Sequence, residues 1–311
     1  MKQQPQFWLS SVLPTGSTYR LEALAPAASF RRFYRVHLET RSAVLMDAPA
    51  PQEDAARFVR LAHRFHRADV PVPDILAHHE PWGYVLMSDL GTRDLQAAYA
   101  AGEANEAVRT AIEHLVRLQR IPSADVPPYT PQRLRDELHL FRQWFVEARL
   151  GRNVHPRWTE FCSAIVEEII RQPRCVVHRD YHCQNLLLSD AGQFGVVDFQ
   201  DALAGPALYD LASLLRDCYH RFDEASIARF LALYLDSSAF QIDEPARALD
   251  LTALQRQLKA IGIFARLALR DGKDTHIEHI GPVLSHACDV TKRLDGYAEL
   301  GNWLNDLRGA L

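Results

Sequence analysis

The spacing of apolar residues changes near residue 90, and this change constrains the fold more than any other feature of the chain. Before it, short apolar runs alternate with turn residues, a pattern typical of β-strands. After it, apolar residues recur at helical intervals, as in Val108, Ile112 and Leu115. We therefore predict an α+β fold with two lobes, a small β-rich lobe over residues 1–90 and a larger helical lobe over residues 91–311.

The first lobe divides into short predicted elements. Alternating residues over 30–38, followed after a short polar connection by the apolar run 43–46, predict a β-hairpin. Apolar residues at helical spacing predict a helix over 52–68. The runs 75–77 and 84–87 are joined through a turn and predict two further strands. We also expect the apolar stripe near the N-terminus, which includes Phe7, Trp8 and Leu9, to pack as a helix on this lobe.

Short apolar runs interrupt the helical lobe at residues 175–177, 186–188 and 195–197. Each run is bordered by polar residues or a turn, so we predict small strands within a helical domain. Asp180 and Asn185 lie at the two ends of the loop that follows the first run. The second and third runs predict a hairpin that returns Asp198 to the same place.

The polar residues of this region fit the pattern H-R-D-x-x-x-x-N followed by D-F. Phosphoryl transfer requires a carboxylate that orients the attacking hydroxyl, and oxygen ligands that hold Mg²⁺ against the ATP phosphates. Asp180 is the candidate catalytic base, and Asn185 and Asp198 are the candidate magnesium ligands. Each residue alone could belong to an ordinary polar turn or strand end, but their joint spacing favours a kinase catalytic loop.

Composition excludes several other classes of protein. The chain has 311 residues, 48% of them hydrophobic, and its 35 basic and 39 acidic residues give a net charge of −4, so it lacks the basic field that nucleic acid requires. We expect no membrane span and no signal peptide, since no run approaches about 20 apolar residues. Five cysteines without a C-x-x-C pair indicate free thiols and a cytoplasmic location.

Two segments carry a resemblance to a known family. Residues 198–201 read D-F-Q-D in place of the protein-kinase D-F-G, and residues 205–212 read G-P-A-L-Y-D-L-A. In these segments the chain resembles the aminoglycoside phosphotransferase superfamily, and the resemblance extends over nearly the whole chain. It implies a two-lobed protein-kinase-like fold, ATP and Mg²⁺ bound between the lobes, and a small-molecule substrate. It also implies that Asp210 braces the catalytic loop through backbone contacts.

Within that superfamily the chain is similar to the bacterial N-acetylmuramate/N-acetylglucosamine anomeric kinases of cell-wall recycling. The similarity lies in residues 28–36, 43–49, 86–91 and 198–217. It implies ATP-dependent phosphorylation of the anomeric hydroxyl of a sugar substrate, in peptidoglycan recycling, to give an α-1-phosphate. Asp201 and Arg216 are the candidate substrate contacts, because they lie close to the D-F-Q-D segment. An alternative for Arg216 is an ion pair with Asp217 or another neighbour.

The chain departs from the kinase pattern on the phosphate side. Residues 27–32 occupy the place of the glycine-rich loop without a glycine, and Met46 stands near the position of the usual strand lysine. Ser29, Arg31 and Arg32 are the candidates for binding the phosphates, because a guanidinium can make bidentate contacts to phosphate. The alternative for both arginines is a solvated strand face.

Two further assignments follow from position. Met87, Ser88 and Leu90 lie where the lobes join, and kinase folds present backbone groups there to adenine; the alternative is an ordinary linker. Glu53 and Asp54 open the helix that takes the place of helix C. Without the lysine, we expect these two acids to complement the helix dipole.

Rival functions remain open. One is a kinase for another hydroxyl compound, such as an aminoglycoside, choline or homoserine, although the mixture of acids and arginines after Asp210 disfavours a cationic substrate. Another is a pseudokinase that only binds ligands, suggested by the missing lysine and disfavoured by the presence of Asp180, Asn185 and Asp198. The sequence ranks neither of the two sugars above the other and indicates no protein partner.

Overall fold

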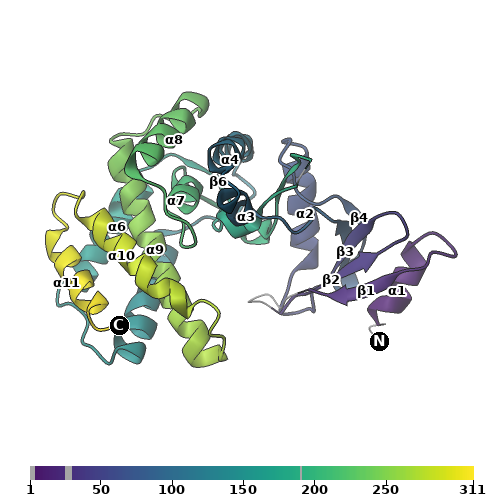
Figure 1. Cartoon of the computed structure of the whole chain (residues 1–311), viewed down its shortest axis with the longest axis horizontal. Coiled ribbons are helices and arrows are strands. Elements are labelled where there is room, and N and C mark those ends of the chain that lie inside the picture. Colours follow the sequence, from purple (N-terminus) through teal and green to yellow (C-terminus); the bar gives the residue numbers. More distant parts are fainter. Residues whose placement is uncertain (1–3, 25–29, 190) are drawn as a thin grey trace. The chain divides into compact units, whose positions relative to one another are not determined.

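The computed structural model describes residues 4–24, 30–189 and 191–311 (Figure 1). Contacts among them divide the chain into two compact units. The sheet unit comprises Met1–Asp94 and Asn185–Gln200, and the helical unit comprises Leu95–Gln184 and Asp201–Leu311. The sequence-based division at residue 90 had placed residues 185–200 with the helical lobe.

The sheet unit is built on an antiparallel sheet with the strand order β1-β2-β3-β5-β4. Its strands are β1 (Arg20–Ala23), β2 (Arg32–His37), β3 (Ser42–Asp47), β4 (Ile75–His79) and β5 (Tyr84–Ser88). The predicted hairpin is confirmed, because β2 pairs with β3 with Phe33 opposite Met46. The predicted pairing of β4 with β5 is also confirmed, through a short 3₁₀ turn, η1 (Glu80–Trp82).

Helix α1 (Pro5–Val12) covers part of this sheet. Trp8 and Leu9 are buried in one apolar cluster with the sheet residues Leu45 and Leu86, as predicted. Phe7 is 66% exposed, so the prediction that it packs on the lobe was wrong. On so short a helix only one face can meet the sheet, and Phe7 lies off that face.

Helix α2 (Ala55–His66) begins three residues later than predicted. Its N-cap is Asp54, whose carboxylate accepts a hydrogen bond from the backbone N–H of Arg57 at 2.8 Å. The helix buries Phe58 and Phe65. Asp54 therefore stabilises the start of the helix as expected, whereas Glu53 lies outside it.

The hairpin of β7 (Leu186–Leu188) and β8 (Phe194–Val196) belongs to the sheet unit because its edges are hydrogen-bonded there. The N–H of Val196 donates to the carbonyl of Pro71 at 2.7 Å, and the N–H of Leu188 donates to the carbonyl of Arg93 at 2.9 Å. These contacts carry the polar residues at the ends of the hairpin into the sheet unit.

The helical unit surrounds the long helix α9 (Pro245–Asp271), which lies beside α10 (Ile280–Thr291) (Figure 1). Its other helices are α3 (Leu95–Ala100), α4 (Ala104–Gln119), α5 (Pro131–Leu140), α6 (Trp158–Ile170), α7 (Tyr209–Leu215), α8 (Glu224–Ser237), α11 (Ala298–Arg308) and the short η5 (Ile277–His279). No helix in the described part of the chain is both long and apolar enough to cross a membrane. The five cysteines all lie in described segments and are free thiols, as predicted.

A π-helix, η2 (Phe141–Arg149), continues α5 and packs on α9. A Cβ atom at Gly262 of α9 would lie within 3.0 Å of backbone atoms of Leu140 and Phe141, so only glycine allows this approach. The apolar periodicity of the sequence did not predict the change from α- to π-helical bonding.

Strand β6 (Arg174–Val177) was predicted, but its partner β9 (Leu203–Pro206) was not. They pair antiparallel, with Val177 opposite Leu203. The predicted catalytic loop directly follows β6, and α7 follows β9 along the chain. This pairing therefore determines which residues of α7 lie beneath the loop.

Candidate active site

The catalytic loop is held at its start by Asp210 of α7. This carboxylate is fully buried, and its two oxygens accept hydrogen bonds from the backbone N–H groups of His178 at 2.6 Å and Arg179 at 2.9 Å. Burial raises the pKa of Asp210, although His178 and the two N–H bonds act in the opposite direction. The prediction that Asp210 braces the loop through backbone contacts is confirmed.

The end of the same loop is held by a second buried carboxylate that sequence reasoning missed. Asp217 accepts from the N–H of Cys183 at 2.8 Å and from the N–H of Tyr219 at 3.0 Å. Between the two braces, Arg179 has a left-handed backbone with φ of 81°. Non-glycine residues adopt this conformation at a cost, and they keep it only where the surroundings determine it.

Asp180, the predicted base, follows directly and is partly open to solvent, with its side chain 39% exposed. Helix α9 contributes two cations next to this residue. Lys259 Nζ lies 3.8 Å from Asp180 Oδ1, and Arg256 donates to the carbonyl oxygen of the preceding residue, Arg179. Burial alone would raise the pKa of Asp180, but Lys259, Arg256 and Arg179 outweigh it and hold that pKa well below its usual range. The carboxylate is therefore ionised at neutral pH.

Glu137 of α5 is a buried acceptor at the back of this loop. It accepts from Arg179 at 2.8 Å and from Gln255 at 3.2 Å, and Tyr129 donates its hydroxyl to the same carboxylate. Lys259 Nζ lies 3.7 Å away. Burial would raise the pKa of Glu137, yet Lys259 and Arg179 lower it. No sequence motif singled out Glu137 or Lys259, because both are far from the loop along the chain.

The predicted magnesium ligands lie in the sheet unit. The hairpin pairs Leu186 with Val196, and the N–H of Val197 donates to the carbonyl of Asn185 at 3.0 Å, so Asn185 and Asp198 are brought together as predicted. Asp198 has a left-handed backbone and a side chain that is 47% exposed. Amide and carboxylate oxygens are the ligand types that Mg²⁺ prefers, so this donor set fits the ion.

Aromatic packing and a hydrogen bond fix the segment that carries Asp198. Phe199 is buried and stacks on Phe58 of α2 with ring centroids 4.7 Å apart, and it also contacts Phe65. Gln200 donates to Asp198 Oδ1 at 2.8 Å. The glutamine that replaces the kinase glycine thus orients the preceding carboxylate.

Arg31 reaches the same carboxylate. Its guanidinium lies 3.6 Å from Asp198 and 3.4 Å from Glu53, and the side chain is buried. The assignment of Glu53 to the helix dipole was therefore wrong, because Glu53 precedes the helix and pairs with Arg31. Arg32 is exposed on β2, which agrees with the alternative of a solvated strand face. Ser29, another predicted phosphate contact, lies outside the described residues.

The predicted adenine-side residues lie at the end of β5 and just beyond it. The Met87 side chain is buried within the sheet unit, and the Ser88 hydroxyl accepts from the N–H of Asp74 at 2.8 Å. Leu90 packs against Gly195 of β8, where a Cβ atom would lie 2.8 Å from its side chain. The side chains of Met87 and Leu90 serve packing, and the N–H of Ser88 donates to the carbonyl of Asp74 at 2.9 Å.

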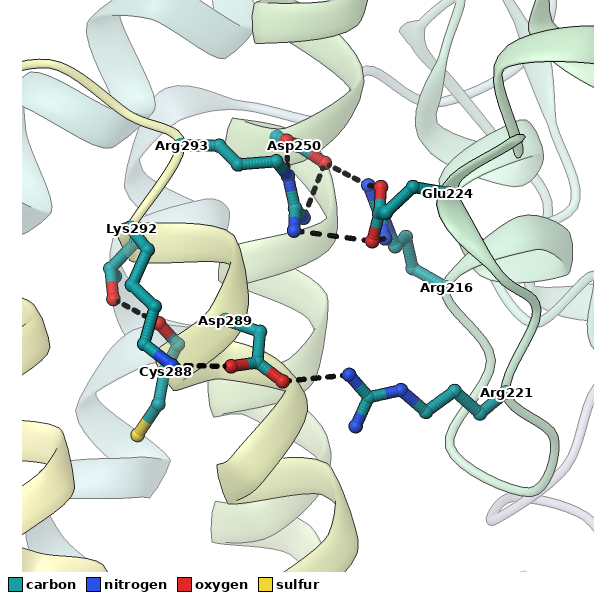
Figure 2. Close-up of polar contacts among 9 residues, drawn as sticks. Arg216, Arg221, Glu224, Asp250, Cys288, Asp289, Lys292 and Arg293 are labelled. Atoms are coloured by element: carbon teal, nitrogen blue, oxygen red, sulfur yellow. Dashed lines mark hydrogen bonds and ion pairs between the residues drawn. The ribbon is translucent and has the colours of Figure 1, made fainter. Parts of the chain in front are cut away.

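Arg216, a predicted substrate contact, belongs to an ionic network in the helical unit (Figure 2). Its guanidinium donates to Glu224 at 2.6 Å and to Asp250 at 2.7 Å, and Asp250 also accepts from Arg293 at 2.8 Å. These carboxylates, rather than Asp217, are its partners. The arrangement favours the ion-pair alternative for Arg216. The other predicted substrate contact, Asp201, has a solvent-exposed side chain.

The match to a family model identifies the class of protein. Residues 20–249 match the model of the phosphotransferase enzyme family, so the chain belongs to that family. It is 37% identical to the N-acetylmuramate/N-acetylglucosamine kinase of Pseudomonas aeruginosa, over 98% of this chain and 96% of that protein. It is 34% identical to the protein of the same name from Neisseria meningitidis serogroup B, over 94% of this chain and 91% of that protein.

Solved structures support the fold. A choline/ethanolamine kinase family protein from Mesorhizobium loti superposes with a TM-score of 0.69 over 99% of both chains, at 13% identity. The GDP complex of an aminoglycoside 2'-phosphotransferase-IIIa mutant gives 0.65 over 94% of this chain and 98% of that one, at 16% identity. The predicted kinase-like α+β fold is confirmed.

Proposed function

We propose that this chain transfers the terminal phosphoryl group of ATP to the anomeric hydroxyl of N-acetylglucosamine or N-acetylmuramate, giving the α-1-phosphate for peptidoglycan recycling. One observation carries the proposal: Asp180, Asn185 and Asp198 occur at kinase spacing in a chain that is 37% identical, over almost its full length, to a kinase named for these two sugars. The braced loop and the donor set described above support the same chemistry.

Asp180 is proposed to orient the sugar hydroxyl and to accept its proton. A carboxylate whose pKa lies below its usual range is a weak base, so it assists best when the proton is acidic or leaves late. Phosphoryl transfer passes through a loose transition state in which positioning matters more than early proton removal. The anomeric hydroxyl is the most acidic hydroxyl of a sugar, and it therefore suits this base.

On the nucleotide side, Asn185 and Asp198 are proposed to hold Mg²⁺, which would offset the negative charge of the ATP phosphates. Arg31 is proposed to supply the cation that the strand lysine supplies elsewhere, because it is paired with Glu53 and directed at Asp198. The pair resembles in its chemistry the lysine and glutamate pair of protein kinases.

The remaining contacts are proposed as follows. Backbone groups at Met87, Ser88 and Leu90 would bind adenine. Asp201 is kept as the candidate sugar contact, because its carboxylate is exposed. Arg216 is proposed to support the surrounding helices, since both ends of its guanidinium are bound by carboxylates.

We also propose a cytoplasmic location. The five free thiols are typical of a chain that functions in a reducing compartment. The proposed reaction uses the sugar, ATP and Mg²⁺, and we expect no nucleic-acid partner.

The test offers the purified chain ATP, Mg²⁺ and a panel of acceptors: N-acetylglucosamine, N-acetylmuramate, their 1-O-methyl glycosides, and choline. Phosphorus NMR should show a sugar 1-phosphate with the two free sugars, and Asp180→Asn should reduce its formation by about 10²–10⁴-fold. Phosphorylation of the methyl glycosides at a similar rate, or phosphate at the 6-position, would refute the anomeric assignment. Turnover of choline alone would refute the sugar assignment.

A further inference from the structure

We infer that Lys259 is a positioning residue for the proposed reaction, which holds the Asp180 carboxylate in place through an ionic contact and is itself anchored by Glu137. The inference rests on the proposed function, since it concerns the same base. Its geometric basis is that one ammonium group reaches both carboxylates, at 3.8 Å from Asp180 Oδ1 and 3.7 Å from Glu137 Oε1.

Helix α9 delivers this lysine together with Arg256. Residues three apart share a helix face, so both cations point at the catalytic loop. Arg256 donates to the backbone carbonyl of Arg179 and lies 4.8 Å over the ring of Tyr209. Arg256 therefore fixes the backbone of the loop at Arg179, and Lys259 is directed at the side chain of the next residue, Asp180.

The burial of Lys259 shows that its charge is compensated rather than solvated. The side chain is buried, and an uncompensated buried ammonium would lose its proton. Burial would lower the pKa of Lys259, but Glu137, Tyr209 and Asp180 raise it above its usual value. Glu137 itself has three hydrogen-bonding partners, so the lysine is held by a rigid anchor on one side and by a partly exposed carboxylate on the other.

Other charged groups pack around the same carboxylate. The cations are Arg179 from its own loop and Arg256 and Lys259 from α9. His182 of the same loop also faces it, and burial lowers the pKa of that imidazole, so it is neutral at neutral pH. The anions of the surrounding elements are Glu137 of α5, Asp210 of α7 and Asp217 just after α7. Arg179 donates to Glu137 and Arg256 donates to the loop carbonyl, whereas Lys259 is directed at the carboxylate oxygen of Asp180.

The test compares Lys259→Met, which removes the charge at similar length, with Lys259→Arg, which retains a cation. The control is Lys292→Met, because Lys292 is exposed and pairs with Asp289 (Figure 2). With ATP, Mg²⁺ and N-acetylglucosamine, we expect Lys259→Met to lower kcat by about 10²-fold and to leave the KM for ATP within about twofold. Lys259→Arg should recover at least tenfold of the lost kcat, and Lys292→Met should match the wild type.

The pH profile separates positioning from simple loss of structure. Without the ammonium, the carboxylate of Asp180 binds a proton more readily, so the acid side of the rate profile should move to higher pH in Lys259→Met. A Lys259→Met variant with wild-type kcat and pH profile would overturn the inference. If that variant does not fold, a Lys259→Arg variant that folds but is as inactive as Asp180→Asn overturns it as well. Failure of the proposed function would appear instead as a wild type that makes no sugar 1-phosphate.

Discussion

Replacing Asp210 by Asn tests whether the catalytic loop depends on a buried carboxylate brace. Both oxygens of Asp210 are used, one by the N–H of His178 at 2.6 Å and one by the N–H of Arg179 at 2.9 Å. An asparagine keeps one acceptor and directs an amide donor at the other N–H. One of the two bonds is therefore lost, and a buried donor is left facing another donor.

The magnitude follows from the type of bond. A hydrogen bond to a charged group contributes about 1.5–3 kcal/mol, and leaving its donor buried and unpaired adds to the loss. We expect the free energy of local opening of the loop to fall by about 2–3 kcal/mol, which corresponds to a roughly 30- to 150-fold faster exchange of the amide hydrogens. Arg179, with φ of 81°, would then relax and displace Asp180, so kcat should fall by about 10²-fold.

Hydrogen exchange read by mass spectrometry on a peptide that covers residues 175–183 measures the first effect, and sugar 1-phosphate formation measures the second. Asp306→Asn is the matched control, because Asp306 is exposed on α11. If Asp210→Asn exchanges and turns over like the control, the brace does not hold the loop, and this reasoning is refuted.

Other changes give equally direct outcomes. Arg31→Ala should raise the KM for ATP by about tenfold, while Arg32→Ala on the exposed strand face should not; equal effects in steady-state kinetics would contradict the assignment. Gly262→Ala should lower the thermal midpoint, costing about 1–3 kcal/mol because its Cβ meets the backbone of Leu140; an unchanged Tm would show that α9 can shift. Arg35 donates to Asp89 at 2.7 Å. Burial would raise the pKa of Asp89, but Arg35 and other hydrogen bonds lower that pKa overall, so the ionised form stabilises the fold at neutral pH. Stability should therefore fall as pH drops below about 4 in the wild type and less steeply in Asp89→Asn, and identical acid unfolding curves would reject the pairing.

The polar residues of the proposed active site could be singled out in the sequence because their spacing is local. Asp180 and Asn185 are five residues apart, and the apolar runs around them predict the hairpin that returns Asp198. Strands β2 to β5 of the sheet unit were predictable for the same reason, since short apolar runs between turn residues indicate strands, whereas β1 was not predicted. Errors concerned element ends and side chains, such as the start of α2 and the exposed Phe7, and also whole elements, such as β9 and the π-helix η2.

Long-range contacts were not predictable from these patterns. Lys259 and Glu137 approach the catalytic loop from α9 and α5. Arg31 pairs with Glu53, and the residues between them in the sequence show no charge pattern that would indicate the pair. The pairing of β6 with β9 likewise joins segments whose own sequences are too short to indicate a partner. An ionic contact between distant residues leaves no periodic signal, because it depends on two side chains and not on a repeated spacing.

The sequence by itself indicated the strand-rich and helical parts of the chain, the kinase-like spacing of Asp180, Asn185 and Asp198, and the family of this protein, since apolar periodicity and motif spacing act over a few residues. Only the tertiary structure decided which charges surround the proposed base. Two basic side chains of the helical unit therefore differ in their surroundings: Arg216 is bound by Glu224 and Asp250, whereas Lys259 is directed at Asp180. The physical reason is that burying a charge requires a compensating partner, and the packing of helices determines which partner lies within reach.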